Sequence, residues 1–318
     1  MTAPLLLIAL CLTAVSAGAA SPQGYPSKPI RMIASGVGGA GDYTARLVAT
    51  ALTSRLGQQV IVDNRPGGLI PGEIVAKAEP DGQTVMLVGI VIWLSPFMRK
   101  TMPFDPVRDF APITLAVTVP NVLVVHPKLR VDSVQDLTAL AKQKPGALNY
   151  ATSGMGNSNH IAGELFKAMA GVDIVQVNYR GAALALNDLL SGRVEMMFAT
   201  ATAAAPHVSS GRLKALAITS AEPSPLMPGL PTVAASGLPG YESGSTLGVF
   251  APAATPKPIV NVLNREIVQF LHSPAAKEQF HRRGIQVVGS SPTEFATAIK
   301  TDMAVKGKVL RAAGIRTD

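Results

Sequence analysis

The chain has 318 residues, a length that suggests about two domains at roughly 150 residues each. Hydrophobic residues make up 47% of it and charged residues only 15%, a balance that excludes intrinsic disorder. The net charge of +8 favours anionic partners, but the basic residues are scattered and aromatic residues reach only 5%, which argues against nucleic acid. A folded protein with a small anion as its partner fits these numbers better.

The N-terminus carries an apolar segment, Leu5 to Val15, that is too short to span a bilayer. Small residues follow at 17–20, as a signal peptidase requires, so residues 1–20 are predicted to be a signal peptide for export to a bacterial periplasm. The alternative is a buried N-terminal strand or helix. Cys11 is the single cysteine and lies in this segment, so the exported chain is predicted to contain no disulfide.

Strand-like and helical patterns alternate along the chain after residue 26. Strands are predicted at 29–34, 59–63, 84–88, 121–126, 148–151, 174–179, 194–198, 214–219 and 247–251. Helices are predicted at 42–56, 160–170, 182–190, 256–272 and 292–313, and one more begins at Ser133. Such alternation requires crossover connections, which predicts an α/β fold with parallel-rich sheets.

The last two helices follow a late strand and cannot form a core alone, so they are predicted to pack back on the N-terminal half. This return predicts two lobes, residues 26–123 plus 248–318 and residues 124–247. Two crossing strands, near Leu123 and Val249, would join them. Two successive domains without such a return is the alternative.

A glycine-rich loop from Gly36 to Gly41 follows the first predicted strand and opens a helix. It matches G-x-G-x-x-G, and Asp63 ends the next strand where a ribose-binding acid is expected, so an NAD(P)-binding oxidoreductase is the main enzyme hypothesis. Export argues against that hypothesis, because periplasmic proteins seldom meet free nicotinamide cofactors. Free amides at a helix N-terminus also bind a carboxylate. The candidate ligand-binding residues here are Ser35, Gly36, Gly38, Gly39 and Asp42.

A second loop of the same kind follows the strand that ends at Ala151. Its candidate ligand-binding residues are Ser153, Gly154, Gly156, Asn157, Ser158 and His160. An ordinary capped turn is the alternative. Two such loops in different lobes can clamp a carboxylate between them.

Further candidates follow the later strands. Tyr179, Arg180 and Gly181 stand at a helix start, where Arg180 either supplies charge to an anion or is solvated. Thr200, after the strand at 194–198, is also a candidate for ligand binding.

Catalytic chemistry finds little support in the sequence. No G-x-S-x-G nucleophile motif occurs, and the five histidines are dispersed. His160 and Glu164 are one helical turn apart, but two ligands are too few for a catalytic zinc site. The sequence therefore predicts no catalytic residue, no metal and no cofactor.

Several motifs, in this order, resemble the Bug family, the substrate-binding components of tripartite tricarboxylate transporters. The resemblance covers essentially the whole exported chain, and its carriers are residues 62–67, 78–82, 103–110, 148–154, 188–192, 211–217 and 237–242. It implies a two-lobed periplasmic binding fold of type II that closes on a small organic carboxylate through loop amides, hydroxyls and ordered water, without catalysis. It also implies membrane transporter subunits or a sensor kinase as partners, and we expect a monomer.

Two departures from the family pattern bear on the ligand. Ala199 stands where the family often has an aspartate, which removes a partner for a ligand ammonium and predicts a carboxylate without an amino group. Trp93 follows the third strand where many members carry serine and threonine. It is either an aromatic wall of the cleft or an anchor of the core, and the sequence does not choose between these interpretations.

Overall fold

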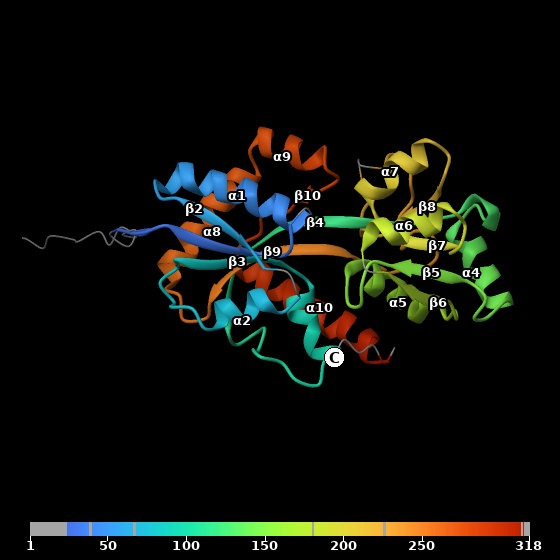
Figure 1. Cartoon of the computed structure of the whole chain (residues 1–318), viewed down its shortest axis with the longest axis horizontal. Helices are drawn as coiled ribbons and strands as arrows, with labels where there is room; N and C mark the ends of the chain where they lie inside the picture. The colour runs from blue at the N-terminus through green and yellow to red at the C-terminus, as the bar shows by residue number, and fades with distance from the viewer. Residues whose placement is uncertain are drawn as a thin grey trace, which may run out of the picture.

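The structure is a computed structural model that describes residues 24–37, 40–65, 68–179, 181–224, 227–312 and 314. The predicted signal peptide lies outside these residues. Two α/β lobes lie side by side along the long axis and are joined by the long strands β4 and β9 (Figure 1). Lobe I holds β1–β3, β10, α1–α3 and α8–α10, and lobe II holds β5–β8 and α4–α7. The residue limits of the lobes given above remain a prediction.

The strands and helices alternate as the sequence indicates. The strands are β1 (Ile30–Ala34), β2 (Val60–Asn64), β3 (Thr84–Gly89), β4 (Phe110–Val125), β5 (Asn149–Thr152), β6 (Val175–Asn178), β7 (Met196–Thr200), β8 (Lys214–Ile218), β9 (Gly244–Pro252) and β10 (Gln286–Val287). The helices are α1 (Ala40–Leu56), α2 (Ile70–Ala76), α3 (Val91–Leu94), α4 (Val134–Gln143), α5 (Ser158–Ala170), α6 (Ala182–Leu190), α7 (Ala201–Ser209), α8 (Lys257–Leu271), α9 (Pro274–His281) and α10 (Pro292–Ala312).

A continuous sheet runs through both lobes in the order β2-β1-β3-β9-β4-β7-β5-β6, with β8 and β10 also paired to β4. The α/β class and the two lobes are confirmed. Within the lobes, β1 pairs in parallel with β2 and β3, and β5 pairs in parallel with β6 and β7, as predicted. The antiparallel pairs all involve the crossing strands β4 and β9, so the sheet as a whole is mixed.

Each lobe is a sheet covered by helices on both faces. In lobe I, the apolar side chains of α1, α8 and α9 form one core cluster, while those of α2, α3 and α10 form another on the opposite face. In lobe II, α4 and α5 cover one face and α6 and α7 the other. Figure 1 shows the C-terminal helices α8 to α10 around the N-terminal strands, which confirms their predicted return.

Strand β4 begins eleven residues earlier than the sequence suggests, at Phe110 instead of Asn121. Pro112 and Pro120 interrupt the expected strand pattern, since proline is normally excluded from central strands. The pairing of β4 with β9 accommodates its irregular N-terminal part through register shifts after Pro112 and after Leu115. A β-bulge interrupts the alternation of side chains between the two faces of a strand, so the sequence pattern does not reveal this part of β4.

The two crossing strands are tied together by one buried hydroxyl. Thr219 Oγ1 accepts from the backbone N–H of Asn121 on β4 at 2.8 Å and lies 2.6 Å from the carbonyl oxygen of Ser243, just before β9. The side chain of Thr219 is fully buried, so water cannot replace either bond. This hydroxyl fixes the point where both strands pass from one lobe to the other.

We therefore expect Thr219→Val to lower the free energy of unfolding by about 1–3 kcal/mol, because it leaves a buried N–H without an acceptor at unchanged side-chain volume. Urea denaturation measures the loss, and Thr219→Ser, which keeps the hydroxyl, serves as the control. Equal stability of the valine and serine variants would show that the hydrogen bonds of the Thr219 hydroxyl contribute no net stability.

Candidate functional site

A cavity of about 360 Å³ lies where the two lobes meet the crossing strands. Lobe I contributes backbone and small side chains from the ends of β1 and β3, and lobe II contributes the starts of α5 and α7. The crossing strands β4 and β9 form part of its wall. Its lining residues are Ser35, Ala40, Gly41, Gly68, Val88, Gly89, Val91, Ile92, Val119, Asn157, Ser158, Thr200, Ser245 and Leu247.

The cavity lies at the carboxyl ends of parallel strands in both lobes. Strands β1, β5 and β7 end at Ala34, Thr152 and Thr200, and each is followed by a helix whose N-terminus faces the same region. Ligands of open α/β sheets bind at this edge, because unpaired N–H groups and the helix dipole favour negative charge there. The fold therefore brings several anion-attracting helix ends to one place.

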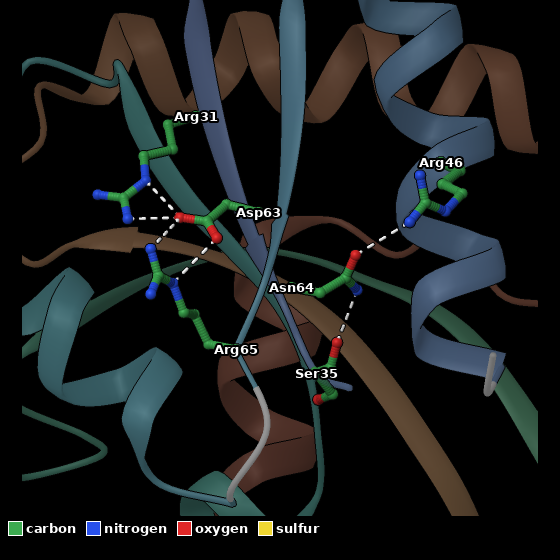
Figure 2. Close-up of polar contacts among 6 residues, drawn as sticks. All are labelled: Arg31, Ser35, Arg46, Asp63, Asn64 and Arg65. Carbon is green, nitrogen blue, oxygen red and sulfur yellow. Dashed lines mark hydrogen bonds and ion pairs between the residues drawn. The ribbon is translucent and has the colours of Figure 1, made fainter. Parts of the chain in front are cut away.

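The first predicted loop is held from behind by Asn64, at the end of β2. Its Nδ2 donates to the carbonyl of Ser35 at 2.8 Å and to the carboxylate of Asp42 at 2.9 Å, while its Oδ1 accepts from Arg46 at 3.0 Å. Figure 2 shows Asn64 between Arg46 and Ser35. Asp42 is buried and paired with Arg46, so it supports the loop and does not line the cavity.

Asp63, the candidate ribose-binding acid, is held by two arginines. Its carboxylate contacts Arg31 at 2.5 Å and Arg65 at 2.9 Å, as Figure 2 shows. Partial desolvation would raise the pKa of Asp63, but the hydrogen bonds and charges of Arg65 and Arg31 outweigh it and hold the pKa below its usual value. Both arginines thus compensate the charge in the protein itself, and the dinucleotide hypothesis gains no support from this residue.

The second predicted loop is held by side chains of α5. Asn159 donates to Ser153 Oγ at 2.8 Å, and His160 accepts the backbone N–H of Gly156 through Nδ1 at 2.9 Å. Gly154 has a φ of +148°, and a Cβ there would lie 2.7 Å from Asn157 Nδ2. His160 is 1% exposed, so it positions the loop and does not touch the cavity.

Because His160 is buried, its titration should make the free energy of unfolding depend on pH. Burial lowers its pKa, Glu164 opposes this shift and Lys167 adds to it. The unfolded chain, with a histidine pKa near 6.5, therefore takes up the proton first as pH falls. We expect the free energy of unfolding to fall below about pH 6.5 by up to about 1.4 kcal/mol per pH unit, until the folded form is protonated as well.

Thermal unfolding from about pH 7.5 to about pH 5.5 measures this slope. His160→Asn keeps an acceptor near the position of Nδ1 but does not titrate, so it should flatten the slope. The exposed His281 provides the matched control, and His281→Asn should leave the slope unchanged. The same slope in His160→Asn as in the wild type would assign the proton to another group.

The described cavity wall carries no charged side chain. Its polar groups are the hydroxyls of Ser35, Ser158, Thr200 and Ser245 and the amide of Asn157, and its apolar groups include Val88 and Leu247. A ligand ammonium would need a buried carboxylate, and no acidic side chain lines the cavity in the part of the chain that is described. The wall suits an anionic group at the helix ends and an aliphatic body beside the valine, isoleucine and leucine side chains.

The structure brings the two predicted loops together at this cavity. Of the predicted site residues, Ser35, Asn157, Ser158 and Thr200 line it. Gly36, Ser153, Gly154 and Gly156 belong to the two loops but do not line it, whereas Gly38, Gly39 and Arg180 lie outside the described residues.

Three other predicted residues lie away from the cavity wall. The hydroxyl of Tyr179 donates to Asp188 at 2.9 Å, and burial and this bond raise its pKa to about 12. Gly181 precedes α6 as its N-cap. Trp93 is 1% exposed and donates from Nε1 to Asp302 at 3.1 Å, which supports the core interpretation of this residue over a cleft wall.

Sequence reasoning missed the contributions of β3, α3 and the crossing strands. Val88 ends a predicted strand, and Gly89, Val91 and Ile92 follow it, but glycine and apolar side chains give no chemical signal. Val119, Ser245 and Leu247 reach the cavity only because β4 and β9 cross beside it.

Two α/β lobes joined by two crossing strands, with a cavity between them that suits a carboxylate, are the architecture of the solute-binding proteins. The family described as "Tripartite tricarboxylate transporter family receptor", TctC, matches residues 44–315. The chain belongs to this family.

Curated relatives match over nearly the whole length. The "UPF0065 protein in tcbD-tcbE intergenic region" of Pseudomonas sp. (strain P51) is 38% identical over 299 residues, covering 93% of this chain and 89% of that protein. Protein BugT of Bordetella pertussis is 34% identical over 321 residues, covering 98% of each. These matches confirm the resemblance to the Bug family.

Solved structures agree with the fold. R. palustris Rpa4515 with adipate has a TM-score of 0.80 and 36% identity, and covers 92% of this chain and 99% of that one. MatC (Rpa3494) from Rhodopseudomonas palustris with bound malate has a TM-score of 0.76 and 26% identity, and covers 90% and 100%. The periplasmic binding protein BugD also has a TM-score of 0.76, at 29% identity, and covers 92% and 100%.

Proposed function

We propose that this chain is exported to the periplasm and captures a small organic carboxylate with an aliphatic body and no amino group in the cavity between its lobes. The proposal rests on the chemistry of the residues that line this cavity. Hydroxyls, helix N-termini and apolar side chains line a cavity of about 360 Å³. No acidic side chain is among its described lining residues. Adipate and malate, the ligands named for two structural relatives, are small dicarboxylates of this kind.

The proposed binding involves no catalytic step, metal or cofactor. Within the described residues, no three side chains of His, Cys, Asp or Glu lie close enough together to hold a metal ion. No described helix combines the length and the hydropathy needed to cross a bilayer. The proposed partner is the membrane part of a tripartite tricarboxylate-type transporter, with a sensor kinase as the second candidate, and the protein is proposed to act as a monomer.

Thermal unfolding of residues 21–318 against aliphatic dicarboxylates, monocarboxylates, aromatic acids, amino acids and NAD(H) tests the proposal. A ligand at 100 times its dissociation constant adds about 2.7 kcal/mol to the stability, which gives a clear shift of the midpoint. We expect the largest shift from an aliphatic carboxylate. A largest shift from an amino acid would contradict the ligand class, and a shift from NAD(H) alone would contradict the proposed function.

The same ligand should draw the lobes together, because closure around the ligand is the hinge motion of such folds. Small-angle scattering should show a smaller radius of gyration with ligand than without. Uptake of the labelled ligand by cells with and without this gene then distinguishes transport from sensing.

A further inference from the structure

One buried amide beneath the cavity wall has no hydrogen-bond partner among the described residues. Asn121 is fully buried, and neither its Oδ1 nor its Nδ2 makes a hydrogen bond within the described structure. Other buried atoms without a partner, Gln83 Oε1 for example, are single atoms of their side chains. Asn121 leaves both its donor and its acceptor unused.

The backbone of Asn121 is fixed at the crossing point of the lobes. Its N–H donates to Thr219 Oγ1 at 2.8 Å, and its carbonyl accepts from the N–H of Thr219 at 2.9 Å. The side chain therefore cannot reach a distant partner by a shift of the strand.

The amide lies on the cavity side of the sheet. Asn121 stands directly opposite Thr200 in the pairing of β4 with β7, and directly opposite residues share a face with Cβ atoms about 5 Å apart. Val119 shares that face because side chains alternate along a strand. Thr200 and Val119 both line the cavity, so the amide of Asn121 lies just behind the wall that they form.

Stability does not explain an asparagine at this position. A buried polar group without a partner lowers the stability of the folded state, and an apolar residue of similar size avoids that loss. The neighbours of Asn121 along β4, Val122 and Leu123, are apolar and fully buried. A polar group that enters the cavity can complete the hydrogen bonds of this amide.

We propose that Asn121 is a specificity-determining residue of the cavity, whose Nδ2 donates to the polar end of the bound carboxylate between Thr200 and Val119, directly or through one water. This inference rests on the proposed function. It assigns the deepest polar contact of the ligand to the crossing strand β4, whereas the two loops hold the ligand from the lobes.

Asn121→Leu tests the inference, because it removes the amide at nearly constant volume. We expect the empty protein to be as stable as the wild type or more stable, and the dissociation constant of the preferred carboxylate to rise about tenfold or more. Asn121→Asp, which brings a like charge toward the ligand, should raise the dissociation constant further. Calorimetric titration and thermal unfolding supply both values.

Gln83→Leu is the matched control, since Gln83 is buried, has an unpartnered Oε1 and does not line the cavity. It should leave the dissociation constant unchanged. If Asn121→Leu destabilises the empty protein more than Gln83→Leu does, the amide has a structural role and the inference is wrong, whatever the ligand. Wild-type protein that binds no member of the panel contradicts the proposed function and this inference together. Equal affinity of the wild type and Asn121→Leu contradicts the inference alone.

Discussion

Gly41→Phe is expected to weaken ligand binding about hundredfold or more, a loss of about 2.7 kcal/mol. Gly41 lies in the first turn of α1 and lines the cavity opposite the crossing strand β9. A Cβ at this position would lie 3.9 Å from both Leu247 and Ser35, in ordinary contact distance, so a side chain fits there and a large one extends into the space of the ligand. The dissociation constant of the preferred carboxylate measures the effect.

Gly41→Ala separates filling of the cavity from damage to the helix. Its single methyl group fits, and alanine is the better helix former by about 0.5–1 kcal/mol, so this variant should bind within a few fold of the wild type and be slightly more stable. Gly41→Phe should also remain folded, with an unfolding midpoint close to that of the wild type in the absence of ligand. Unchanged affinity in the phenylalanine variant would place the ligand outside this cavity.

Trp93→Ala is expected to lower the free energy of unfolding by about 3–5 kcal/mol. Trp93 packs against Phe250 and Phe295, with ring centroids 6.0 and 5.9 Å away, and its indole N–H holds Asp302 of α10. Truncation leaves a cavity among these rings and removes a buried donor. Chemical denaturation of the ligand-free protein measures the loss.

Ligand affinity decides between the two sequence interpretations of Trp93. As a core anchor, Trp93 should affect binding little, so Trp93→Phe, the milder variant, should keep the wild-type dissociation constant while losing part of the stability. An aromatic wall of the cleft would show the reverse, with a large loss of affinity and a small loss of stability. That reverse result would contradict the placement of Trp93 in the core.

The expected ligand class depends on the cavity wall and not on Ala199. The substitution of an aspartate by Ala199 suggested that the ligand has no amino group, but Ala199 is fully buried in the core of lobe II and does not line the cavity. Its neighbour Thr200 lines the cavity instead, because successive side chains of a strand point to opposite faces. The wall supports the same ligand class by its lack of a described acidic side chain.

The sequence by itself determined the class of fold, most of the elements and the two loops. These features depend on local signals, such as the alternation of strand and helix patterns, glycines before helix starts and Ser133 as the N-cap of α4. The motifs of the family also lie within short segments, so they are recognisable from the order of the residues alone. Ser35 and Ser158, placed in the site from such signals, both line the cavity.

Only the tertiary structure decided which side chains face the cavity. Trp93, Asp42 and His160 carry suitable chemistry, but each is buried among its own partners, and a sequence does not show which face of a strand or helix a neighbour covers. The partnership of Asp63 with two arginines and the place of Asn121 behind Thr200 depend on contacts between segments far apart in the chain. Burial and strand register arise from those long-range contacts, and no local pattern contains them.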